Sequence, residues 1–285
     1  MGNIRQAVFA GTWYPGSASG CQNEIEKMTV SSSMIPDTSG AHTGGIVPHA
    51  GWYFSGGIAC DVMRQLKSTA SDPDVVVIFG THMHATMPIS VMRTGAWETP
   101  LGNLSIHEPL AEELIRRVPG IRDASHATDA DNTIEIQLPF IRYFWKHVKI
   151  LPVSAPPASI SIEAGKSVAA AATALGLKII VLGSTDLTHY GPNYGLVLKR
   201  KTEDALEWVR HDNDKGMIDA MLSMSPEAVI AQAQEKLNGC CAGAAAAALS
   251  AGRALGAVRG KLMAYATSFD KSPGESFVGY AGIVF

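Results

Sequence analysis

Histidine side chains follow three apolar, strand-like runs of this 285-residue sequence, each within a few residues of the end of its run. His49 follows "GGIVP", His82 and His84 follow "VVVIFGT", and Asp186 and His189 follow "IIVLGST". In an open α/β sheet, ligands bind in the crevice outside the carboxyl ends of the parallel strands. We therefore expect these side chains to meet at one site.

Two imidazoles and one anionic side chain would suit iron, copper or zinc, because imidazole is the commonest protein ligand of such metals. The candidates for the anionic ligand are Asp186, Glu135 and the thiolate of Cys240. Cys240 stands at the start of a predicted helix, where the helix dipole favours a thiolate. His189, three residues after Asp186, is suited to act as a general acid or base near neutral pH.

Other signatures of catalysis are missing from the sequence. There is no GxGxxG after the first strand, no Walker A loop, no HExxH and no GxSxG elbow. The segment "VLGSTDLTHYG" contains Ser, Asp and His, but all three lie within six residues. Known triads collect their members from separate segments, so a hydrolase triad is disfavoured.

The overall composition is that of an ordinary globular protein, with 46% hydrophobic and 17% charged residues and a formal net charge of −3. A net charge this close to zero does not indicate binding to nucleic acid or to an anionic membrane. No apolar run approaches the roughly 20 residues of a membrane span. The first residues lack the features of a signal peptide, so we expect a cytoplasmic protein.

The four cysteines show no CxxC and no disulfide-like spacing, so we expect free thiols: Cys21, Cys60, Cys240 and Cys241. The adjacent pair has a second interpretation besides metal binding. Cys240 and Cys241 could simply be two small apolar residues that open an alanine-rich helix, because free cysteine is often buried.

Short apolar runs alternate with longer helical patterns along the chain. Strands are predicted over 44–50, 74–80, 148–155, 178–184, 261–269 and 276–285, with an antiparallel excursion over 88–106. Helices are predicted over 55–68 with Ser55 as N-cap, 108–118, 132–145 interrupted at Pro139, 161–176, and most of 196–256. Strand 74–80 is apolar on both faces, as in a covered parallel sheet. The pattern predicts one α/β domain over residues 1–285, with a mixed, mostly parallel central sheet flanked by helices.

Six segments, in this order, resemble the Memo family: "AGTWYPG", "PHAGWYFSGG", "GTHMH", "NTIEIQLPF", "STDLTHYG" and a Cys before a small-residue helix. That family shares its fold with class III extradiol dioxygenases, the LigB type of non-haem iron enzyme. The resemblance covers roughly residues 7–285. No single segment is specific for the family, but the six segments in this order are.

The resemblance implies a metal site formed by His49, His82 and Cys240, where the dioxygenases use two His and a carboxylate. Asp186 and His189 are implied to lie beside that site.

Aromatic residues are implied to wall the pocket, at the positions of Trp13, Tyr14 and Trp52. We also expect His84, Asn132 and Glu135 to contact the substrate.

Three positions depart from the family pattern. Asn132 replaces the His of the usual His-Ser-Ile-Glu segment, Met83 replaces a second consecutive His, and Cys241 stands where Gly is common. The metal-binding trio is unaffected, but its surroundings differ.

Two functions follow as expectations. The first is a metal-dependent oxidoreductase similar to extradiol dioxygenases, with iron favoured and copper or zinc possible, acting on a small aromatic substrate. The second is a non-catalytic module that uses the same pocket for an aromatic or anionic ligand or peptide, such as a phosphotyrosine. A structural zinc site is disfavoured because the Cys-rich spacing of such sites is absent.

Overall fold

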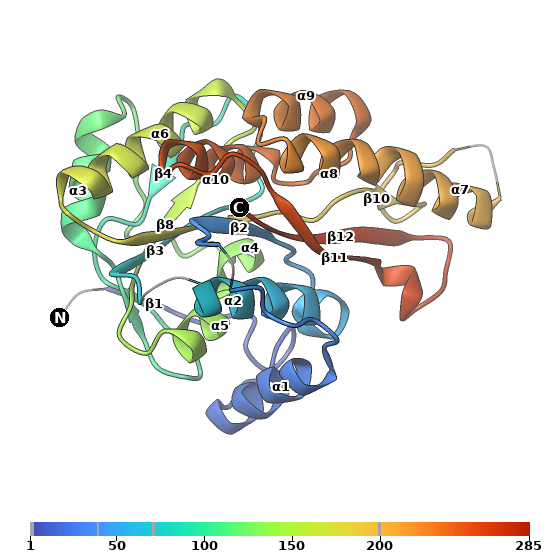
Figure 1. Cartoon of the computed structure of the whole chain (residues 1–285), viewed down its shortest axis with the longest axis horizontal. Coiled ribbons are helices and arrows are strands. Elements are labelled where there is room, and N and C mark those ends of the chain that lie inside the picture. Colours follow the sequence, from blue (N-terminus) through green and yellow to red (C-terminus); the bar gives the residue numbers. More distant parts are fainter. Residues whose placement is uncertain (1–2, 39, 70–71, 199–200) are drawn as a thin grey trace.

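The structure is a computed structural model that describes residues 3–38, 40–69, 72–198 and 201–285. A twisted β-sheet crosses the middle of the molecule, and helices cover both of its faces (Figure 1). Within the described residues the sheet has nine strands, in the order β10-β12-β2-β9-β3-β8-β4-β7 with β11 beside β12. The predicted α/β architecture with a mixed, helix-flanked sheet is confirmed.

Four parallel strands form the centre of the sheet: β2 (Gly44–Val47), β9 (Ile179–Ser184), β3 (Val75–Gly80) and β8 (Lys149–Ser154). Every residue of β2 and β3 is buried, which explains why their sequences are small or apolar without alternation. Because parallel strands end at the same edge of a sheet, the residues that follow β2, β3 and β9 lie close together.

Antiparallel strands extend the sheet on both sides. On one side β12 (Phe277–Val284) pairs with β2, β10 (His189–Tyr190) and β11 (Lys261–Thr267). On the other side β4 (Ser90–Val91) is antiparallel to β8 and parallel to β7 (Arg122–Asp123).

A small separate sheet lies beside the main one. It contains β1 (Ile4–Arg5), β5 (Ala96–Trp97) and β6 (Leu104–Ser105) among the residues described. The predicted excursion over 88–106 therefore comprises β4, which joins the main sheet, and the antiparallel pair β5 and β6.

The alanine-rich helix α10 (Ala242–Ala254) packs closely on one face of the sheet and against α6 (Ser159–Ala174). Glycines permit the approach: a Cβ on Gly183 would lie 2.9 Å from the carbonyl oxygen of Ala244. A Cβ on Gly165 would lie 2.2 Å from the carbonyl oxygen of Ala247. Small side chains thus fix the start of α10, and the two cysteines before it, above the edge where β3 and β9 end.

Helix α2 (Gly57–Thr69) covers the opposite face, against β2 and β12. A five-residue π-helix, η1 (Trp52–Gly56), precedes it. Ser55 was predicted to cap this helix, but it lies within η1 and its hydroxyl donates to the carbonyl of Ala50. The wider π turn therefore starts the helical segment earlier than the capping pattern predicts.

The predicted helix over 132–145 is two helices, α4 (Asn132–Glu135) and α5 (Leu138–Phe144), with Pro139 in the first turn of α5. Proline is tolerated there because the amide hydrogens of a first turn have no partner within the helix. The remaining helices are α1 (Ala18–Ser31), α3 (Glu108–Arg117), α7 (Thr202–Trp208), η2 (Val209–Asn213), α8 (Asp214–Leu222), α9 (Pro226–Lys236) and η3 (Ser268–Asp270).

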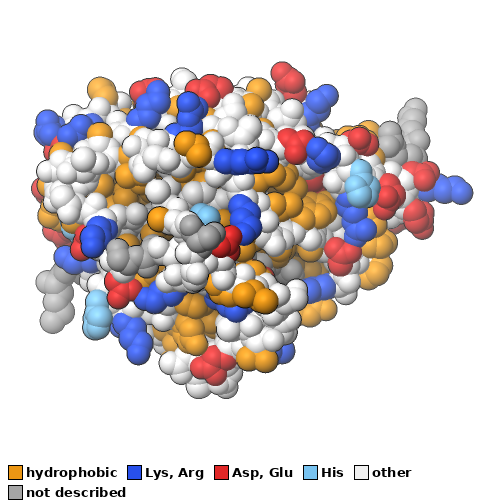
Figure 2. Space-filling view, viewed as in Figure 1, with side chains coloured by type: hydrophobic (Ala, Val, Ile, Leu, Met, Phe, Trp, Pro, Cys, Tyr) orange, Lys and Arg blue, Asp and Glu red, His pale blue; other side chains and the backbone are white. Residues whose placement is uncertain are grey.

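Positive and negative side chains are interspersed on the face of the molecule seen in Figure 2, with scattered hydrophobic atoms between them. In the part of the chain that the structure describes, no helix has the length and apolar character needed to cross a bilayer.

Candidate metal centre

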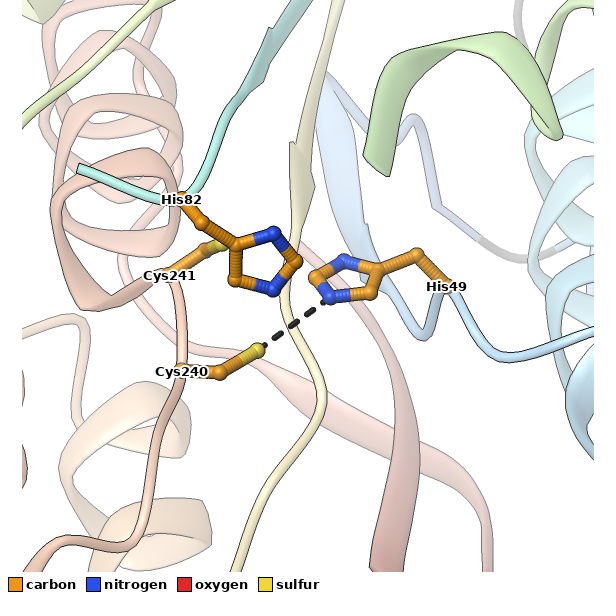
Figure 3. A group of neighbouring side chains, drawn as sticks. All are labelled: His49, His82, Cys240 and Cys241. Atoms are coloured by element: carbon orange, nitrogen blue, oxygen red, sulfur yellow. Dashed lines mark hydrogen bonds between the residues drawn. The ribbon is translucent and has the colours of Figure 1, made fainter. Parts of the chain in front are cut away.

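Four side chains that can bind a metal converge at the carboxyl edge of the sheet: His49, His82, Cys240 and Cys241. One ligand atom of each lies within 4.8 Å of the ligand atoms of the other three. Figure 3 shows Cys240 pointing toward the ring of His49, and Cys241 lying beside His82. The Cys240 Sγ is 3.2 Å from His49 Nε2. The three residues implied as ligands by the family resemblance are therefore brought together.

The dimensions of this cluster fit a metal ion. Typical Zn–S and Zn–N bonds give a tetrahedron with edges of about 3.3–3.8 Å. The distance of 3.2 Å between Cys240 Sγ and His49 Nε2 lies just below that range, and the most distant pair of ligand atoms is at most 4.8 Å apart. Side-chain rotations that move atoms by roughly an ångström would close the cluster around one ion.

The turn before His82 is strained and held by hydrogen bonds. Thr81 has a φ of 73°, which is unfavourable for a β-branched residue. Its amide donates to the hydroxyl of Thr133 at 2.6 Å, and its own hydroxyl contacts Asp131 at 2.6 Å and Ser154 at 2.8 Å. Such strain typically costs about 1–3 kcal/mol and is concentrated at functional sites. The strained residue turns the chain so that His82 reaches the cluster.

A serine orients the other imidazole. The His49 Nδ1 is 3.1 Å from Ser184 Oγ, and the Ser184 hydroxyl donates to the carbonyl of Thr133 at 2.6 Å. Since that hydroxyl hydrogen is already used, Ser184 accepts a hydrogen bond from Nδ1–H. This assignment directs Nε2 toward Cys240, so Nε2 is the nitrogen that would bind a metal once it has lost its proton.

His49 and Cys240 each shift the pKa of the other. Burial opposes the charged form of His49, but Asp186 and then Cys240 outweigh it and raise the pKa of His49 to about 9. Burial likewise opposes the Cys240 thiolate, but a hydrogen bond from Cys241 and the charge of His49 hold the pKa of Cys240 well below its ordinary value. The thiolate also accepts a hydrogen bond from the Asp186 amide at 3.3 Å.

Cys241 shows the opposite shift. Burial, followed by the hydrogen bond to the neighbouring Cys240, raises the pKa of Cys241 well above its ordinary value. The pKa values of the two neighbouring thiols are therefore shifted in opposite directions. Asp186 is also buried, and burial followed by the Cys240 charge raises its pKa, although His49 opposes this.

A cavity of about 600 Å³ opens directly beside the two imidazoles. His49, His82, Asp186 and His189 all line it; His49 and Asp186 are buried, whereas His82 is exposed. The Nδ1 of His189 is 3.1 Å from the carbonyl oxygen of Leu187 and can donate to it, which leaves Nε2 available within the cavity. The predicted acid–base residues therefore share this cavity with the two candidate histidine ligands.

The three aromatic residues predicted to wall the pocket lie in two kinds of position. Trp13 lines the cavity and is 39% exposed, whereas Tyr14 and Trp52 are each 3% exposed and do not line it. The Tyr14 hydroxyl donates to Glu135 at 2.9 Å, and the Trp52 indole donates to the carbonyl of Ile136 at 3.0 Å. These two rings are buried and do not face the cavity, because their polar atoms form hydrogen bonds in the protein interior.

The three polar residues predicted to contact substrate have different positions. Asn132 lines the cavity and donates to the carbonyl of His49 at 3.1 Å. His84 is exposed, contacts the Thr86 hydroxyl at 2.9 Å, and does not line the cavity.

Glu135 anchors the N-terminal segment instead of facing the cavity. Its carboxylate accepts hydrogen bonds from the amides of Val8 at 3.1 Å and Phe9 at 2.7 Å, and from the Tyr14 hydroxyl. This carboxylate therefore holds in place the loop that carries Trp13.

Several residues of the cavity were not predicted from the sequence. They are aromatic residues and serines from distant segments: Tyr53, Phe54, Tyr194, Tyr280, Ser268, Ser272 and Ser276. Tyr53 and Phe54 could have been found from their place directly after Trp52. The serines come from the connection between β11 and β12, and nothing in their spacing marks them.

Fold and site together define a class of protein: an α/β protein whose parallel strands end at a cluster of histidines and cysteines beside a cavity. A family model described as Memo-like protein matches residues 5–284. The chain therefore belongs to the Memo family, as the resemblance predicted.

Archaeal relatives match along most of their length. A MEMO1 family protein of Pyrobaculum aerophilum is 30% identical over 99% of both chains. A MEMO1 family protein of Pyrococcus furiosus is 34% identical over 99% of this chain and 98% of that protein. Another, from Thermococcus kodakarensis, is 35% identical over 85% of this chain and 86% of that protein.

Proposed function

We propose that this Memo-family protein is a metal-dependent enzyme, of the oxidoreductase type, that acts on a small aromatic substrate. The observation that carries the proposal is the position of the candidate ligands. Buried His49 and exposed His82 both line a cavity that is also lined by a histidine suited to acid–base chemistry, His189.

His49, His82 and Cys240 would hold the ion, with iron expected from the resemblance and copper or zinc as alternatives. When bound, such a metal supplies Lewis acidity and, if it is iron or copper, electron transfer. The Nε2 of His189 would accept the proton of a substrate hydroxyl, because its Nδ1 can donate to the backbone. Ser184 would keep His49 in the ligating tautomer.

The cavity favours an aromatic, weakly charged substrate. Trp13, Phe54 and Tyr194 offer ring faces, and serine hydroxyls offer hydrogen bonds. Among the described residues that line the cavity there is no lysine or arginine. Recognition of a phosphate group normally relies on such cations. The lining thus gives more support to an enzyme of small aromatic compounds than to a phosphotyrosine-binding module, which stays as the alternative.

The proposal is tested by metal content and turnover. Protein purified anaerobically should contain close to one metal ion per chain, and His82→Ala and Cys240→Ala should each lose it. His84→Ala is the matched control, since His84 lies two residues away but outside the cluster. It should retain the metal.

Oxygen consumption with a catechol is then measured on the iron-loaded protein. Uptake that requires both His82 and His189 supports the oxidoreductase. The proposal would be refuted if wild type bound no iron, copper or zinc when offered, or if the loaded protein consumed no oxygen with any catechol tried. Ligand binding by metal-free protein would then favour the binding module.

A further inference from the structure

Cys241 is a residue of the cluster for which neither the family pattern nor the proposed reaction has a use. It occupies a position where the sequence pattern of the family commonly has glycine, and it follows directly after Cys240. Its side chain is buried, with 2% exposure, yet its Sγ lies within 4.8 Å of the ligand atoms of His49, His82 and Cys240. A buried thiol this close to three other ligand atoms requires an explanation.

The backbone holds Cys241 firmly in this place. Its amide donates to the Thr185 hydroxyl at 3.0 Å. Its carbonyl accepts hydrogen bonds from Ala244 at 3.0 Å and Ala245 at 3.2 Å, which makes it the N-cap residue of α10. The thiol is therefore held at the N-terminus of a 13-residue helix, beside the other three candidate ligand atoms.

The two cysteines approach the centre of the cluster differently. In Figure 3, Cys240 reaches toward His49 from below, whereas Cys241 lies on the side of His82. The four ligand atoms thus come from distinct directions. Two sulfurs and two nitrogens in such an arrangement form the donor set that binds zinc-like metals tetrahedrally.

We propose that Cys241 is a fourth protein ligand, so that the centre is a His2Cys2 site for a thiophilic divalent metal ion. The inference rests on the metal site of the proposed function and adds one ligand to it. Both imidazoles line the cavity, whereas neither sulfur does. Substrate would therefore reach the ion from the side of the imidazoles, while the two sulfurs would hold the ion from the other side.

Cobalt(II) provides a direct probe of the ligands, because thiolate-to-cobalt charge-transfer absorption scales with the number of bound thiolates and visible bands report tetrahedral coordination. Metal-free, full-length protein is titrated with Co²⁺ under anaerobic conditions. Wild type should show the intensity of two thiolates. Cys241→Ser and Cys240→Ser should each show about half of it per bound cobalt, since each retains one thiolate.

Two cysteines outside the cluster supply matched controls, since Cys21 and Cys60 are also buried and free. Cys21→Ser and Cys60→Ser should keep the full wild-type absorption. Cys241→Gly, which introduces the residue common in the family, should bind Co²⁺ with the absorption of a single thiolate. This variant removes the side chain without adding a hydroxyl, and circular dichroism checks that it folds.

The outcomes separate the two proposals. If Cys241→Ser and Cys241→Gly both kept the full charge-transfer intensity, the fourth-ligand assignment would be wrong, while the three-ligand metal site would stand. If wild type bound no Co²⁺ and no other metal, the metal site itself would fail, and this inference with it.

Discussion

Asp214 offers a quantitative test of how a buried charge controls stability near the site. This carboxylate begins α8 and is completely buried beneath β12. Its Oδ1 accepts hydrogen bonds from the amide of Thr188 at 2.9 Å and from the Thr188 hydroxyl, and its Oδ2 accepts one from the Tyr265 hydroxyl at 2.8 Å. Asp214 thereby fixes Thr188, which lies between the two predicted acid–base residues in the sequence.

Burial is the main cause that raises the pKa of Asp214, from 3.8 to about 6, although hydrogen bonds from Thr188 and Tyr265 oppose it. A carboxyl group with a raised pKa stabilises the folded state fully at pH below about 4. That stabilisation is lost as the pH rises through about 6. The pKa of Asp214 in the folded protein thus lies roughly 2 pH units above its value in the unfolded protein. This difference corresponds to about 3 kcal/mol of unfolding free energy.

Asp214→Asn removes this titration and preserves most of the hydrogen bonds. The amide oxygen can still accept from Thr188, and the amide nitrogen can donate to the Tyr265 oxygen. We expect the unfolding free energy of the variant, relative to wild type, to increase by about 3 kcal/mol between pH 4 and pH 8. Urea unfolding of metal-free protein at several pH values measures this difference.

Asp219→Asn is the matched control, since Asp219 lies on the same helix, is exposed and pairs with Lys215. Its effect should vary little with pH, because exposed ion pairs contribute at most about 1 kcal/mol. A difference between wild type and Asp214→Asn that stayed constant from pH 4 to pH 8 would refute the reasoning.

Two further changes test the support of the metal centre. Ser184→Ala should weaken metal binding by about 10–100-fold, because His49 loses the partner that fixes its tautomer. Competition with a chelator measures the affinity. An unchanged affinity would show that the Ser184 hydroxyl does not orient the ring. Gly243→Ala should lower the unfolding free energy by about 1–3 kcal/mol and reduce metal content, because a Cβ there would lie 2.1 Å from the Pro156 carbonyl oxygen. Gly57→Ala has open space around the new Cβ and should be neutral or slightly stabilising, so equal losses in both glycine variants would contradict the packing argument.

The central sheet could be predicted because burial on both faces leaves a clear pattern. The continuous apolar residues of β3 are typical of a strand covered on both faces, and the rule for parallel strands then puts His49 and His82 at one edge. The strand pattern gave no sign of the strain at Thr81, because a positive φ depends on hydrogen bonds from segments about 50 and 73 residues away in the chain.

The roles of aromatic residues were harder to predict. Trp13 and Trp52 both belong to segments that resemble the family, but one lines the cavity and the other is buried. A ring with a polar tip fits either environment, and the tertiary hydrogen bond to the backbone decides which. The position of His84 was equally hard to predict. Its ring contacts Thr86, two residues further along the chain, and it is not part of the cluster.

The order of the ligands along the chain has a consequence for biosynthesis. His49 and His82 leave the ribosome well before Cys240 and Cys241, which are separated from them by more than half of the sequence. A growing chain therefore exposes two imidazoles without their sulfur partners, and weakly held ions can leave it. The thiolates join only when α10 docks on the finished strands. Firm capture of the proposed metal ion would thus be a late event of maturation, and it would distinguish folded molecules from partly synthesised ones.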